Sequence, residues 1–138
     1  MTKTQLANGD YIDFPTYHHQ KKPTKNKSIW TIANAKEEEI CLANEIIDKD
    51  YKTTKQSKII GFNVKRQKNK LVILGEDIYK KDLKLSRFEQ NNQIWHGYPV
   101  NHMARNSDKP DNIILDKLYT NNKINIIERK RILQGKPL

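Results

Sequence analysis

The spacing of apolar residues along the chain predicts one long helix over about residues 35–51. Four apolar side chains recur there at intervals of three or four, which places them on one helix face. These residues are Ile40, Ala43, Ile47 and Tyr51. Asn34 precedes them as a candidate N-cap. Glutamates fill positions 37–39, in the first turn, where the helix dipole favours negative charge. We interpret them as a solvated capping cluster rather than as acid–base or metal-binding groups.

Alternating apolar and polar residues predict strands after this helix. Ile60, Phe62 and Val64 alternate with polar or small residues, as in a half-buried strand. Residues 71–74 form a continuous apolar run, which is typical of a strand covered on both faces. Only six residues separate the two segments, so we expect an antiparallel hairpin over 57–75.

The pattern is less regular in the next third of the chain. Residues 76–89 fit no single period, so we expect a short helix or an irregular crossing there. The segment 94–100 has the most distinctive residues, because two aromatic side chains flank a His-Gly pair. Pro99 restricts Tyr98 to an extended conformation.

The last 29 residues predict a helical hairpin. Pro110 suits the first turn of one helix. Asn125 and Glu128 have the spacing of a capping box at the start of a second helix, which Gly135 would end.

These elements predict an α+β fold, in which a small antiparallel sheet packs on one helix and a helical hairpin follows at the C-terminus. The length of 138 residues suits one domain. We assign that domain to residues 30–138. Residues 1–29 are too polar to bury much surface, so we expect an extended, partly mobile arm with one short strand near Tyr11.

Composition narrows the class of protein. No apolar run approaches the ~18 residues that a membrane span needs, and the first residues lack the apolar region of a secretory signal. The single cysteine, Cys41, excludes a disulfide framework. We therefore expect a cytoplasmic protein with no membrane partner.

Charge then points to a polyanionic partner. The chain has 26 Lys and Arg against 16 Asp and Glu, a net charge of +10. Residues 57–87 alone carry nine basic and three acidic side chains. We therefore expect a nucleic-acid-binding module with RNA or single strands as its ligand. Its predicted contacts are the hairpin cations, two C-terminal arginines and two aromatic side chains that could stack on bases: Lys65, Arg66, Lys68, Lys70, Arg129, Arg131, Trp95 and Tyr98.

A second hypothesis is a small metal-independent ribonuclease of the toxin or effector type. Such an enzyme needs two groups that exchange protons and a cation that stabilises the charge on phosphorus. Histidine suits both proton roles, so His96 and His102 are candidates, with Arg105 as the cation and Lys109 as a weaker substitute. The adjacent His18 and His19 would complete the site if the N-terminal segment folds back.

A third hypothesis is a protein-interaction adaptor whose basicity reflects compositional bias. Lysine accounts for 21 of the 26 cations, as an A/T-rich genome would favour, and residues 94–100 would then form an apolar docking loop. The sequence has no zinc-binding cysteine pairs, no glycine-rich phosphate loop and no metalloprotease motif. We therefore expect neither a metal nor another cofactor.

Overall fold

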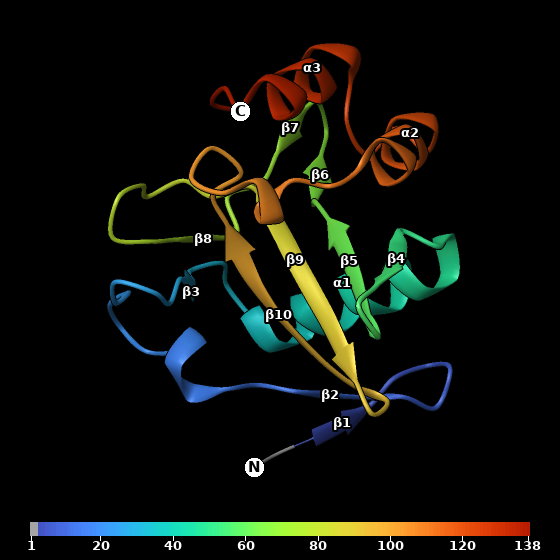
Figure 1. Cartoon of the computed structure of the whole chain (residues 1–138). Helices are drawn as coiled ribbons and strands as arrows, with labels where there is room; N and C mark the ends of the chain where they lie inside the picture. The colour runs from blue at the N-terminus through green and yellow to red at the C-terminus, as the bar shows by residue number, and fades with distance from the viewer. Residues whose placement is uncertain (1–2) are drawn as a thin grey trace.

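Six strands form the main sheet, in the order β1-β2-β10-β9-β5-β4, and all neighbours are antiparallel except β2 and β10 (Figure 1). A computed structural model describes residues 3–138, and its fold is mixed α+β, with a mostly antiparallel sheet and three helices. The strands of the main sheet are β1 (Lys3–Gln5), β2 (Tyr11–Asp13), β4 (Lys52–Lys55), β5 (Lys58–Asn63), β9 (Leu85–Asn91) and β10 (Ile94–Val100). Parts of the predicted N-terminal arm therefore belong to the sheet.

Two short strand pairs lie outside the main sheet: β3 (Ile29–Trp30) with β8 (Gly75–Glu76), and β6 (Arg66–Gln67) with β7 (Lys70–Leu71). The predicted hairpin over 57–75 is wrong, because β5 pairs with β4 and β9 instead. Residues 72–74 do not continue the strand. The Leu74 carbonyl accepts hydrogen bonds from the amides of Thr31 and Ile32. The segment that follows β3 thus supplies the hydrogen bonds that a partner strand would otherwise provide. The apolar run is nevertheless buried at Leu74.

Helix α1 (Ala35–Lys49) lies behind the sheet as Figure 1 is drawn. Leu42, Ala43 and Ile46 are buried on its inner side. Gly61 of β5 lies directly beneath Ile46, where an added Cβ would come within 2.6 Å of the Ile46 side chain. The helix and sheet approach each other this closely because that position has no side chain.

The start of α1 differs from the prediction in two ways. Asn34 is the N-cap residue, but its side chain caps no amide and its backbone is left-handed, with φ 55°. Glu39 is not solvated: it is fully buried, and one carboxylate oxygen lies 2.7 Å from His19 Nε2. Burial of a carboxylate is favourable only with such a partner, and His19 supplies it from the N-terminal segment.

Strands β9 and β10 form a hairpin whose two faces differ. Phe88 pairs with Gly97 on the side of α1, where an added Cβ on Gly97 would meet the Phe88 ring at 2.3 Å. Residues 85–89 were expected to be irregular, and that prediction is wrong. The strand pattern is obscured in the sequence because each face of β9 mixes residue types: Leu85 shares one face with the charged Arg87 and Glu89, and the polar Ser86 shares the other with Phe88.

Two further helices, α2 (Asn112–Thr120) and α3 (Ile126–Gln134), lie beyond one end of the sheet (Figure 1). The predicted capping box is present: the Asn125 side chain accepts from the Glu128 amide, and the Glu128 carboxylate accepts from the Asn125 amide. Gly135 ends α3 in a left-handed conformation with φ 66°. Within residues 3–138, no helix is long and apolar enough to cross a bilayer.

Candidate functional site

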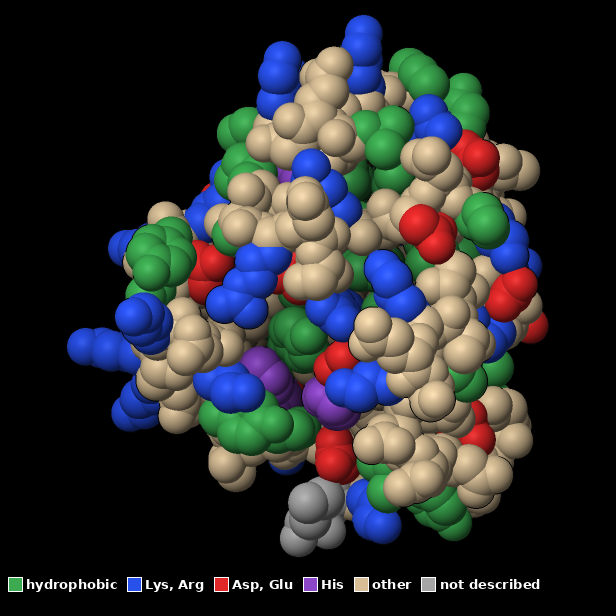
Figure 2. All heavy atoms as spheres, in the orientation of Figure 1, with side chains coloured by type: hydrophobic (Ala, Val, Ile, Leu, Met, Phe, Trp, Pro, Cys, Tyr) green, Lys and Arg blue, Asp and Glu red, His purple; other side chains and the backbone are tan. Residues whose placement is uncertain are grey.

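A pocket of about 490 Å³ opens on the face of the sheet that is turned away from α1. Strands β9 and β10 form its floor, and its walls come from the short helices η1 (Thr16–His18) and η2 (Asn106–Asp108) and the loops beside them. Figure 2 shows this face, where histidine, cationic and acidic side chains gather around a hollow near the centre. The volume lies in the range of ~300–1,000 Å³ that is typical of small-ligand sites.

Four side chains form a square on the pocket floor. In the β9–β10 register, Arg87 faces Tyr98 and Glu89 faces His96. Because alternate residues of a strand point to the same side, all four project from one face of the hairpin. Two neighbouring cross-strand pairs of the hairpin thus bring a cation, a carboxylate, an imidazole and a phenol together on one face.

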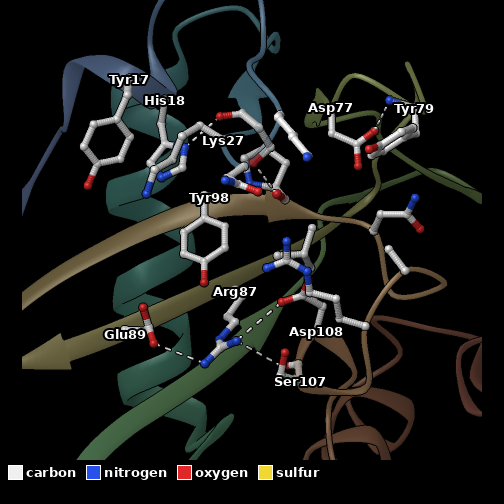
Figure 3. Close-up of a pocket in the computed structure, with 18 of the residues that line it drawn as sticks. Tyr17, His18, Lys27, Asp77, Tyr79, Arg87, Glu89, Tyr98, Ser107 and Asp108 are labelled. Carbon is white, nitrogen blue, oxygen red and sulfur yellow. Dashed lines mark hydrogen bonds and ion pairs between the residues drawn. The ribbon is translucent and has the colours of Figure 1, made fainter.

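Arg87 is held in place by three groups. Its Nη2 donates to Glu89 at 3.1 Å, and its Nη1 donates to the Ser107 carbonyl at 3.1 Å and lies 3.4 Å from an Asp108 oxygen (Figure 3). The side chain is 13% exposed. Arg87 is therefore a fixed, largely desolvated guanidinium on the pocket floor, and Glu89 and Asp108 balance part of its charge.

His96 and Glu89 form a pair across the two strands. His96 Nε2 lies 3.4 Å from Glu89 Oε2. The hydrogen bond from His96 is the main reason that the pKa of Glu89 lies below its ordinary value. Glu89 is therefore ionised at neutral pH, and its two oxygens are engaged by Arg87 and His96.

His18 enters the same pocket from the N-terminal segment. Its ring is stacked on Tyr98, with ring centroids 5.0 Å apart, and it lies between Tyr17 and Tyr98 in Figure 3. His18 Nδ1 is 2.7 Å from the Ser28 carbonyl, which can only accept, so Nδ1 carries the proton. Burial lowers the pKa of His18 to about 4, despite that hydrogen bond. At neutral pH its Nε2 is therefore an unprotonated proton acceptor.

Tyr98 lies close to both imidazoles. The His96 and Tyr98 ring centroids are 6.3 Å apart, and both histidines line the pocket with Tyr98. Burial raises the pKa of Tyr98 to about 12, so its phenol keeps the proton and can donate it to an anion.

Three further cations stand at the pocket rim: Lys25, Lys27 and Arg105. All three are exposed. Arg105 was a predicted site residue, and it lies in the same pocket as His96. The rim therefore adds positive charge to the fixed charge of Arg87 on the floor.

His102 lies elsewhere. It is 4% exposed, its Nε2 is 2.6 Å from the Lys136 carbonyl, and it does not line the pocket that contains His96. Burial lowers the pKa of His102. Lys109 is likewise outside the pocket. The histidine that accompanies His96 is His18, from the segment that the sequence suggested only as a complement.

The cations of the predicted hairpin divide into two groups. Lys65 and Arg66 form ion pairs with Glu38 and Glu128, respectively, and both are partly buried. Lys68 and Lys70 are exposed on the β6–β7 turn.

The remaining predicted contacts are also dispersed. Trp95 is 1% exposed and donates to Asp10, so its ring offers no face for a base. Arg129 pairs with Asp116 at 2.6 Å, and Arg131 is exposed on α3. Of the two predicted stacking residues, only Tyr98 lies in the pocket.

Arg87 and Glu89 are among the pocket residues that sequence reasoning missed. Their spacing of two, on either side of the apolar Phe88, is the one available signal. It indicates a strand with a polar but covered face. That arrangement is unusual unless the covered face lines a binding site.

Comparisons with protein-family models, curated proteins and solved structures found no match. In the described part of the chain, no three His, Cys, Asp or Glu side chains lie close enough together to hold a metal ion. The case for a function therefore depends on the geometry of the pocket.

Proposed function

We propose that the protein is a metal-independent ribonuclease that cleaves RNA by attack of the ribose 2′-hydroxyl on the adjacent phosphorus. The observation that carries this proposal is the meeting of His18 and His96, which are 78 positions apart in the sequence, in one pocket with the fixed guanidinium of Arg87. Two imidazoles and a cation are the groups that this reaction needs.

The two histidines differ in a way that assigns their roles. His18 is neutral at pH 7 with a lone pair on Nε2, so it accepts the 2′-hydroxyl proton. His96 Nε2 lies against the ionised Glu89, which orients the imidazole ring, and we assign His96 to donate a proton to the departing 5′-oxygen. The 2′-oxygen forms a bond to phosphorus as the bond to the 5′-oxygen breaks, which yields a 2′,3′-cyclic phosphate.

Glu89 is better suited to orienting than to accepting the substrate proton. Its two oxygens already contact Arg87 and His96, so neither is free to accept the 2′-hydroxyl proton. Arg87 faces the negative charge that develops on the phosphoryl oxygens, and Arg105 at the rim adds to it.

This proposal keeps RNA as the partner and replaces the hairpin with the pocket as its site. Lys65 and Arg66 are engaged by carboxylates, and Trp95 is buried. The two imidazoles beside Tyr98 are what favours catalysis over binding alone.

The test is incubation of end-labelled single-stranded RNA with the protein in excess EDTA. We expect shortened products that end in a 2′,3′-cyclic phosphate, and no cleavage where the 2′-hydroxyl is replaced by hydrogen. His18→Ala and His96→Ala should each lower the rate by about 10²–10⁴-fold. The exposed Lys130→Ala is the matched control and should cleave normally. Bound but intact RNA under all conditions would reject the ribonuclease and favour a binding module.

A further inference from the structure

Two exposed tyrosines stand at opposite sides of the pocket. Tyr17 is 41% exposed and Tyr79 is 74% exposed, and both line the cavity. Figure 3 shows them on either side, with Lys27 between them and Tyr98 on the floor below. They come from separate segments, η1 and the loop between β8 and β9.

The ring of Tyr17 has a defined setting. The His18 ring meets it edge-on at 4.6 Å, and Lys27 Nζ lies 4.5 Å above it. The ring is therefore held beside the imidazole that we assign as the base, and a cation lies within reach of a neighbouring phosphate.

Tyr79 is presented by a closed turn. Asp77 Oδ1 accepts hydrogen bonds from the amides of Tyr79 and Lys80 at 2.8 and 2.7 Å, and the Asp77 amide donates to the Lys80 carbonyl. The turn thus fixes the backbone at Tyr79 while its side chain stays in solvent. The ring therefore offers an open face on which a base can stack.

We propose that Tyr17 and Tyr79 are stacking platforms for the two bases that flank the scissile phosphate, so that the substrate is single-stranded RNA. This inference rests on the proposed function, because it places the phosphate between the two histidines. Aromatic rings stack on any base, so these platforms select unpaired strands without selecting a sequence. In a duplex both bases are already stacked and paired, and neither can reach its ring.

Binding of uncleavable RNA tests the platforms separately from catalysis. The probe is a short fluorescent oligonucleotide with 2′-fluoro ribose, which lacks the attacking hydroxyl, measured by anisotropy as a single strand and as a hairpin duplex. We expect the single strand to bind more tightly. Tyr17→Ala and Tyr79→Ala should each weaken its binding by about 5–100-fold and leave duplex binding unchanged.

Two controls keep the test specific. Tyr79→Phe retains the ring and should bind like the wild type. Tyr119→Ala removes a tyrosine of 44% exposure on α2, outside the pocket, and should have no effect. If both pocket variants bind the single strand as tightly as the wild type, the platforms are rejected.

The outcomes separate the two proposals. Normal cleavage of unmodified RNA together with unaffected binding in the tyrosine variants would retain the ribonuclease and reject the stacking platforms. Binding that depends on both tyrosines, without any cleavage, would retain the platforms and reject the ribonuclease.

Discussion

One arginine–carboxylate pair lies at the β6–β7 hairpin and another lies in the pocket, and the surroundings of these two pairs differ. At the hairpin, Arg66 donates to Glu128 and, at 3.0 Å, to the Lys123 carbonyl, which ties the hairpin to the start of α3. In the pocket, Arg87 contacts Glu89 beside His96 and a cavity. The first pair joins two elements, whereas the second holds a cation where a ligand can reach it.

The contrast shows that local density of cations is a poor guide to a binding site. In the stretch of sequence with the most cations, two of the four, Lys65 and Arg66, form ion pairs with carboxylates of the same fold. The pocket draws Lys27, Arg87 and Arg105 from three distant segments. A binding site is therefore better indicated by which charges the topology brings together than by charges that are consecutive.

Among the substitutions that compare the hairpin with the pocket, replacing the pocket arginine should have the largest effect. Arg87→Ala removes the fixed charge that faces the phosphoryl oxygens, and we expect cleavage of single-stranded RNA to slow by about 10²–10³-fold. Arg87→Lys should recover only part of the rate, because lysine cannot contact Glu89, Ser107 and Asp108 at once. Urea unfolding of both variants checks that the fold persists. A rate within threefold of wild type in a folded Arg87→Ala protein would contradict the proposed site.

The pocket also differs from the hairpin in carrying a histidine whose burial changes stability with pH. The pKa of His18 is about 4 in the folded protein and 6.5 in the unfolded chain. Between these two pH values the unfolded chain therefore binds more protons than the folded protein does. The contribution of His18 to stability is complete above pH 6.5 and is lost as pH falls towards 4. From pH 7 to pH 4.5, this amounts to about 2 kcal/mol.

Urea unfolding at the two pH values measures this loss. His18→Gln should lose about 2 kcal/mol less than the wild type on acidification, because glutamine does not titrate. Glu39→Gln is the opposite control. Burial raises the pKa of Glu39 to about 7, so its contribution is present below pH 4.5 and lost as pH rises through 7. Without the Glu39 carboxyl, the free energy of unfolding should therefore fall more steeply between pH 7 and pH 4.5 than it does in the wild type. Equal slopes for the wild type and His18→Gln would show that His18 is not buried as a neutral group.

Removing the hairpin arginine should affect stability and not cleavage. Arg66→Ala loses the ion pair with Glu128 and the hydrogen bond to Lys123, and both side chains of the pair are partly exposed. We expect the free energy of unfolding to fall by about 1 kcal/mol. The rate of RNA cleavage, measured well below the unfolding midpoint, should stay within twofold of wild type. A large loss of rate with unchanged stability would instead place the hairpin in the active site.

Local signals in the sequence predicted the elements whose stability is local. The spacing of Asn125 and Glu128 identified the capping box of α3, and the helical period located α1 to within a few residues. The apolar run at 71–74 led to the wrong prediction of a strand. Residues buried beneath loops are apolar just as residues buried in a sheet are, so the residue types do not distinguish the two cases. Nothing local indicates which strand pairs with β5.

The candidate site was predictable only in part, for the same reason. His96, Tyr98 and Arg105 are close in sequence and were identified, whereas His102, equally close, turns inward to the Lys136 carbonyl. The choice between His18 and His19 depends on contacts that no sequence pattern records. One stacks on Tyr98, and the other pairs with Glu39 of α1.

The smallest expected effect is a change in the salt dependence of RNA affinity, which should differ between the pocket and the β6–β7 hairpin. Each phosphate contact with a single strand contributes about 0.7 to the slope of log affinity against log salt. Lys27→Ala, at the pocket rim, should therefore reduce that slope by about 0.7 for 2′-fluoro RNA. Lys68→Ala, on the exposed β6–β7 turn, should leave it unchanged. Anisotropy titrations at ~50, ~100 and ~200 mM salt measure both slopes. A reduced slope for Lys68→Ala alone would move the RNA path to the hairpin, whereas reductions in both variants would extend one path across the two regions.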